Sequence, residues 1–80
     1  MMNELYGACD RAVEFIHFLW DNVSTEELCD VDEWESFDDY DINVVGSTYH
    51  GQSPTMLRCI VVHKDNQNNV LFSCSIGGTW

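Results

Sequence analysis

The chain has 80 residues, which is enough for one small domain and too few for two. Hydrophobic residues make up 45% of it and aromatic residues 12%, a composition too apolar for a disordered protein. Its net charge of −11, from fourteen acidic residues against three basic ones, disfavours contact with nucleic acid or an anionic membrane and favours a basic partner. We therefore treat residues 1–80 as a single folded domain.

The first predicted element is an amphipathic helix from residue 3 to about residue 23. Apolar residues recur there at alternating steps of four and three, which is the period of one helix face: Leu5, Cys9, Ala12, Ile16, Leu19 and Val23. Phe18 lies nearer the polar side and is a candidate exposed contact. The first residues lack the basic and apolar features of a signal peptide, and no stretch has the length of a membrane span. We expect a cytoplasmic protein that does not bind membranes.

The second predicted element begins at a capping box. Ser24 is the expected N-cap, Glu27 occupies the third helical position, and Val23 with Leu28 can form a hydrophobic staple around them. These residues predict that 25–39 is helical, either as one helix or as two short helices that meet near Asp30.

The remainder of the chain is predicted to form strands. Residues 42–45 are predicted to open a first strand, a loop follows at 49–54, and 57–63 pairs with 70–76 in a hairpin around the turn formers at 65–68. The inward residues of the last strand are expected to be Val70, Phe72, Cys74 and Ile76, and Trp80 is expected either to cover the core or to be exposed. The predicted fold is α+β, with N-terminal helices packed on a small three-stranded antiparallel sheet.

Acidic residues concentrate between residues 21 and 41. Ten of the fourteen lie there with no Lys or Arg among them, and Trp34, Phe37 and Tyr40 recur every three residues, as if on one helix face. Runs of charge are most often solubilising surface. In a helix, however, these ten carboxylates would lie about 3 Å apart along the axis, close to the phosphate spacing of about 3.4 Å on each DNA strand. They would also repel one another at a cost that solubility does not require.

Catalysis and metal binding are weakly indicated. The four cysteines lie among apolar neighbours, as reduced core cysteines do, and an acidic field opposes thiolate formation. Residues 39–50 imitate a calcium loop but have Val44 where glycine is required and His50 where glutamate is required. The three histidines show no zinc-ligand spacing. We predict no enzyme activity, no catalytic residue, no metal ion and no cofactor.

The size, the net charge, the α+β layout and the acidic segment from Glu26 to Asp41 resemble the small acidic inhibitors of bacteriophages and mobile elements, which include DNA mimics, anti-restriction proteins and anti-CRISPR proteins. This resemblance is one of strategy and rests on no motif. It implies a non-enzymatic inhibitor in the host cytoplasm, a monomer or homodimer, that binds a basic nucleic-acid-binding host protein or complex in place of nucleic acid.

Two other functions fit the same charge: an immunity or antitoxin protein that blocks a basic toxin enzyme, and an accessory interaction domain. Under the first hypothesis the partner-binding residues are the carboxylates of the segment and one aromatic anchor: Glu26, Glu27, Asp30, Asp32, Glu33, Trp34, Glu35, Asp38, Asp39 and Asp41.

Overall fold

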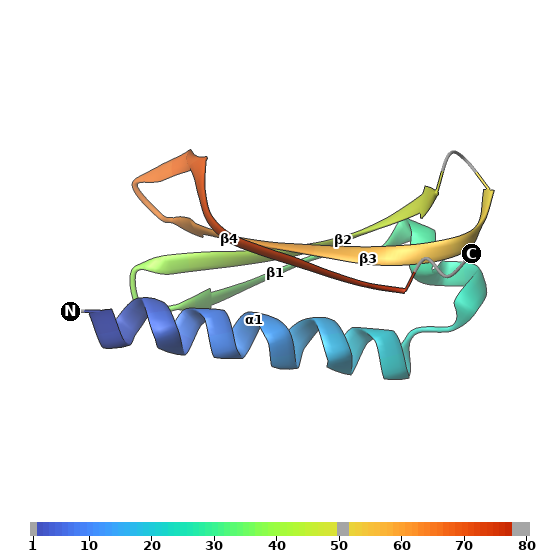
Figure 1. Cartoon of the computed structure of the whole chain (residues 1–80), viewed down its shortest axis with the longest axis horizontal. Coiled ribbons are helices and arrows are strands. Elements are labelled where there is room, and N and C mark those ends of the chain that lie inside the picture. The colour runs from blue at the N-terminus through green and yellow to red at the C-terminus, as the bar shows by residue number, and fades with distance from the viewer. Residues whose placement is uncertain (1, 50–51, 78–80) are drawn as a thin grey trace.

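The computed structural model describes residues 2–49 and 52–77. A long α-helix and a short 3-10 helix precede four strands, which run in chain order α1 (Met2–Asn22), η1 (Thr25–Asp30), β1 (Asp32–Phe37), β2 (Tyr40–Tyr49), β3 (Gln52–His63) and β4 (Asn66–Gly77). The strands form one antiparallel sheet in the order β1-β2-β3-β4. α1 lies along one face of this sheet, and neither helix of the described residues covers the other face (Figure 1). The predicted α+β class is confirmed, but the sheet has four strands where we expected three.

The helix α1 packs through the face that its periodicity predicted. Ala8, Ala12, Ile16 and Leu19 are buried, and Leu5 and Val23 pack against the same core. The sheet contributes the buried side chains beneath the helix, which are Ile42, Val44, Leu57, Cys59 and Val61. The small side chains of Ala8 and Ala12 let the helix lie close to the sheet, so that the Cys59 thiol reaches the carbonyl oxygen of Ala12 at 3.9 Å.

The prediction of a helix over 25–39 was wrong. Only Thr25–Asp30 is helical, as a single 3-10 element, and Asp32–Phe37 is the edge strand β1. Ser24 and Glu27 do meet, since the Ser24 hydroxyl donates to the Glu27 carboxylate at 2.9 Å, but the Ser24 side chain caps no backbone N–H. The capping-box sequence is present but the Ser24 capping bond does not form, and the helical segment ends after six residues.

Electrostatics favours the strand over the predicted helix. In a helix, carboxylates three and four residues apart would lie about 5–6 Å from one another on the same face. In a strand, successive side chains point to opposite faces, so Asp32 and Glu33 are separated by the sheet itself. The prediction that Trp34, Phe37 and Tyr40 share one face was therefore wrong as well. Trp34 is 53% exposed, whereas Phe37 and Tyr40 are half-buried and pack against the core.

The hairpin of β3 and β4 confirms the predicted pairing with one change. Phe72, Cys74 and Ile76 pack against the core as expected, but Val70 is half exposed. The register shifts between Val61, which pairs with Phe72, and Val62, which pairs with Val70. The extra residue, Leu71, is a β-bulge that turns Val70 away from the inward face. Trp80 lies outside the described residues.

Candidate interaction surface

Seven exposed carboxylates follow one edge of the molecule. η1 carries three of them, the edge strand β1 carries two, and the turn between β1 and β2 carries two. We call this set the acidic edge, and it consists of Glu26, Glu27, Asp30, Asp32, Glu33, Asp38 and Asp39. β1 is the outermost strand on its side of the sheet, so its own carboxylates lie at a border of the fold where a partner can approach. The turn continues this border at one end of β1, and η1, which packs on β2 and β3, precedes β1 at its other end.

The sheet holds η1 in place through Gly46. Gly46 of β2 donates its N–H to the carbonyl oxygen of Val31 at 2.9 Å, and the backbone of Leu28 lies directly over the Gly46 α-carbon. Leu28 itself is buried, with 4% of its surface exposed. η1 therefore sits on the same face of the sheet as α1, and its carboxylates are fixed relative to β1.

The turn at the other end of the acidic edge is also tied down. Asp38 adopts a positive φ of 52°, a conformation that aspartate tolerates better than most residues. Lys64 donates its N–H to the carbonyl oxygen of Asp39 at 2.9 Å, which joins this turn to the turn between β3 and β4. The carboxylates at both ends of the acidic edge are thus carried on backbone held by hydrogen bonds.

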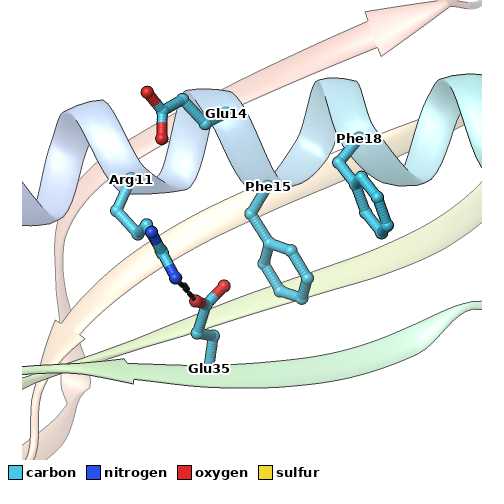
Figure 2. Close-up of a pocket in the computed structure, with 5 residues that line it drawn as sticks. All are labelled: Arg11, Glu14, Phe15, Phe18 and Glu35. Carbon is cyan, nitrogen blue, oxygen red and sulfur yellow. Dashed lines mark hydrogen bonds and ion pairs between the residues drawn. The ribbon is translucent and has the colours of Figure 1, made fainter.

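Four of the predicted partner-binding carboxylates accept hydrogen bonds within the fold, and two of them accept from two donor atoms each. Glu35 accepts from Nε of Arg11 at 2.7 Å and from Nη2 at 2.6 Å (Figure 2). Asp41 accepts from the Ser36 hydroxyl at 3.1 Å and from Nε2 of Gln67 at 2.6 Å. Their carboxylates stabilise the packing of α1 and β4 on the sheet and are less available than the acidic edge.

The Arg11–Glu35 ion pair spans a cleft between α1 and β1. The cleft has a volume of about 330 Å³, with Phe15 and Phe18 beside the ion pair (Figure 2). Phe18 is 60% exposed, which confirms its predicted position away from the core. Glu14 of α1 also lines the cleft.

Trp34 provides an apolar contact within this charged border. It pairs with Asn43 across β1 and β2. Because the next residue, Glu35, points to α1 and pairs with Arg11, Trp34 lies with Asp32 on the opposite face of the sheet. The Asn43 amide donates to the Asp32 carboxylate at 3.1 Å and to the Glu33 carbonyl at 3.0 Å, which ties the two residues before the tryptophan to β2. Exposed tryptophan surrounded by polar groups is typical of an anchor residue at a protein interface.

The strand geometry lowers the charge density that the sequence predicted. β1 has six residues, so it extends about 20 Å at about 3.3 Å per residue. It carries three carboxylates over that length, or about one per 7 Å, which is half the linear density of a DNA strand. The acidic edge therefore resembles nucleic acid in sign and in its continuous border, and less closely in spacing.

Comparison with known proteins returned no match. No family model, no curated protein and no solved structure is similar to this chain.

The acidic edge lacks internal neutralisation. Within residues 2–49 and 52–77, Arg11 with Glu35 is the single ion pair between an arginine or lysine and a carboxylate. We expect added salt to stabilise the protein, because it screens repulsion among the remaining carboxylates. Between low salt and about 0.5 M sodium chloride at pH 7 the free energy of unfolding should rise by about 1 kcal/mol, which raises Tm by about 4–8 °C. A melting temperature that is flat or falls with salt would contradict this electrostatic description.

Three of the four cysteines are poorly suited to act as catalytic nucleophiles. Burial raises the pKa of Cys59 to about 12 and also raises the pKa values of Cys9 and Cys74, so little thiolate forms at neutral pH. Cys29 is the exception, because it is exposed in η1 where we expected a core residue. The described residues contain no group of three or more potential ligands placed to hold a metal ion, and none of their helices is long and apolar enough to cross a membrane.

Thiol labelling tests which cysteines are exposed and which are buried. Iodoacetamide should modify Cys29 rapidly in the native protein and Cys59 only on unfolding, and Cys29→Ser should remove the rapid phase. Because the pKa of Cys59 is raised from 9.0 to about 12, the unfolded chain ionises this thiol first. The stability that comes from burying the neutral Cys59 thiol is complete below pH 9 and should be lost as the pH rises towards 12. Rapid labelling that persists in Cys29→Ser would reopen the question of a reactive cysteine.

Proposed function

We propose that this protein is a non-enzymatic inhibitor that binds a basic nucleic-acid-binding protein or complex through the acidic edge, in place of nucleic acid. The observation that carries the proposal is the acidic edge itself: seven exposed carboxylates on one border, none of them in an ion pair with a lysine or arginine of the described chain. An edge of this kind attracts a surface rich in lysine and arginine and accelerates its approach.

The rigidity of the border supports a specific interaction. Backbone hydrogen bonds from Gly46 and Lys64 hold the two ends of the acidic edge, so little conformational entropy is lost when it binds. Trp34 supplies the apolar anchor that charge alone lacks. A surface that served solubility only would need neither feature.

The proposal is tested by capture and competition. The immobilised protein is incubated with a bacterial lysate, and captured proteins are eluted with rising salt or with duplex DNA and RNA. We expect a basic nucleic-acid-binding protein that is released by salt and displaced by nucleic acid, because both ligands would occupy the same cationic groove. A captured protein that binds nucleic acid and this chain at the same time would overturn the proposal. Capture of a basic toxin enzyme without nucleic-acid competition would favour the immunity or antitoxin alternative.

A further inference from the structure

The two edges of the sheet differ sharply in charge. The edge strand β1 carries three carboxylates in six residues, whereas the edge strand β4 is twelve residues long and contains no charged residue. β4 pairs with β3 on one side, and no described segment pairs with its other side. About half of its backbone N–H and C=O groups therefore point outward without a strand to receive them.

Proteins usually protect such an edge with charges, proline or short length. β1 is both short and charged, but β4 has none of these features. Its pairing with β3 is irregular near the hairpin turn, at the bulge at Leu71 and again between Val62 and His63, and is regular from Phe72 to Gly77. This regular part of β4 is a template for another strand.

An apolar groove adjoins the same edge. Leu5, Tyr6 and Cys9 of α1 and Phe72 of β4 line a groove of about 270 Å³. Tyr6 is 67% exposed, which is the largest exposure of any large hydrophobic side chain described. The groove and the unpaired strand together offer a partner both backbone hydrogen bonds and apolar contact.

We propose that two copies of this chain associate through β4, edge to edge and antiparallel, to form one continuous eight-stranded sheet. An antiparallel pair of identical strands is related by a two-fold axis perpendicular to the sheet. That symmetry places both α1 helices on the same face of the combined sheet, so that the two grooves face each other across the seam. Phe72 and Tyr6 of each copy then bury apolar surface against the other.

The distribution of charge favours a second copy over a basic partner as the occupant of this edge. A basic partner finds its complement at the acidic edge and has no charge to pair with along β4. Two copies each carry a net charge of −11 and repel each other overall, but pairing through β4 puts the two β1 strands at opposite ends of the sheet. Seven spacings of about 4.8 Å separate them by about 34 Å, which is several times the Debye length of about 8 Å at physiological salt. Both acidic edges therefore remain exposed in the dimer.

Sedimentation equilibrium from micromolar to millimolar protein tests the association. The expected result is a shift from 9.2 kDa towards twice that mass as concentration rises. Tyr6→Glu should raise the dimer dissociation constant at least tenfold, because it removes apolar contact and places a negative charge at the seam. Phe18→Glu is the matched control, since Phe18 is a similarly exposed aromatic of α1 on the side of β1, and it should leave the dissociation constant unchanged.

Hydrogen exchange reports on the strand itself. Amides of Phe72–Gly77 that point outward should exchange slowly at high concentration and at least tenfold faster on dilution, whereas amides of β1 should not change. A mass of 9.2 kDa at every concentration, equal weakening by the two variants, or a dimer without protection in β4 would each overturn the proposal. Asp30→Lys with Glu33→Lys should leave the dimer intact, so this test is independent of the proposed function.

Discussion

Reversing two charges at the centre of the acidic edge should weaken binding to the captured target by about 3 kcal/mol, or more than a hundredfold in Kd. The change is Asp30→Lys with Glu33→Lys. It removes two attractions and sets two repulsions against a basic groove. Both side chains are exposed and neither is in an ion pair, so the fold should remain intact and become slightly more stable as repulsion is relieved. Isothermal titration calorimetry measures the affinity and thermal unfolding measures the stability.

The matched control is a second pair of exposed acidic residues. Glu4→Lys with Asp10→Lys makes the same change in net charge on α1, at residues that are not part of the acidic edge. It should cost less than about 1 kcal/mol of binding free energy, since only long-range attraction is reduced. If the α1 pair weakened binding as much as the edge pair, net charge would be acting without a defined surface. Trp34→Ala should then be compared, because loss of an anchor acts independently of charge.

A single methyl group at Gly46 should lower the free energy of unfolding by about 3–5 kcal/mol. A β-carbon there would overlap the carbonyl group of Leu28, which is backbone and cannot rotate away. The collision forces η1 off the sheet, breaks the hydrogen bond from Gly46 to Val31, and exposes Leu28. For an 80-residue domain this loss is a large part of the total stability. Denaturation by urea measures it directly.

Gly7→Ala separates the steric effect from the general effect of replacing glycine. A β-carbon at Gly7 would meet the ring of Phe37 at 2.8 Å, and the end of that side chain can shift. Alanine also favours the helix over glycine by about 1 kcal/mol, so the net change should be within about 1 kcal/mol of zero. Equal destabilisation by the two variants would show that η1 does not depend on the contact with Gly46. Gly46→Ala should also weaken target binding, because it displaces Glu26, Glu27 and Asp30.

The proposed surfaces divide the molecule between its two sheet edges. β1 carries the charge that a basic partner would contact, and β4 carries the uncharged strand that a second copy would pair with. Because the edges lie at opposite sides of the sheet, occupation of one leaves the other accessible. A dimer would then present two acidic edges to one target or to two.

Local patterns were sufficient for the parts of the fold in which burial is periodic. The four-and-three spacing from Leu5 to Val23 determines α1, and the β-branched run at 60–62 with the turn formers after it determines the hairpin of β3 and β4. The net charge of −11 and its concentration between residues 21 and 41 are properties of the sequence alone. They sufficed to predict an acidic surface, because exposed carboxylates stay exposed in almost any fold.

The shape of that surface was decided by tertiary contacts. The capping-box sequence and three aromatics at steps of three favour a helix locally. Three tertiary contacts form only when residues 32–37 are a strand: Phe37 packs on Gly7, the backbone of η1 packs on Gly46, and Glu35 pairs with Arg11. Each of these contacts joins residues far apart in the sequence, so no local window contains them. Together with the ladder to β2 they outweigh helix propensity, which amounts to less than about 1 kcal/mol per residue. The sequence alone therefore determined how much negative charge this protein carries, and only the tertiary structure decided that the charge lies along a sheet edge.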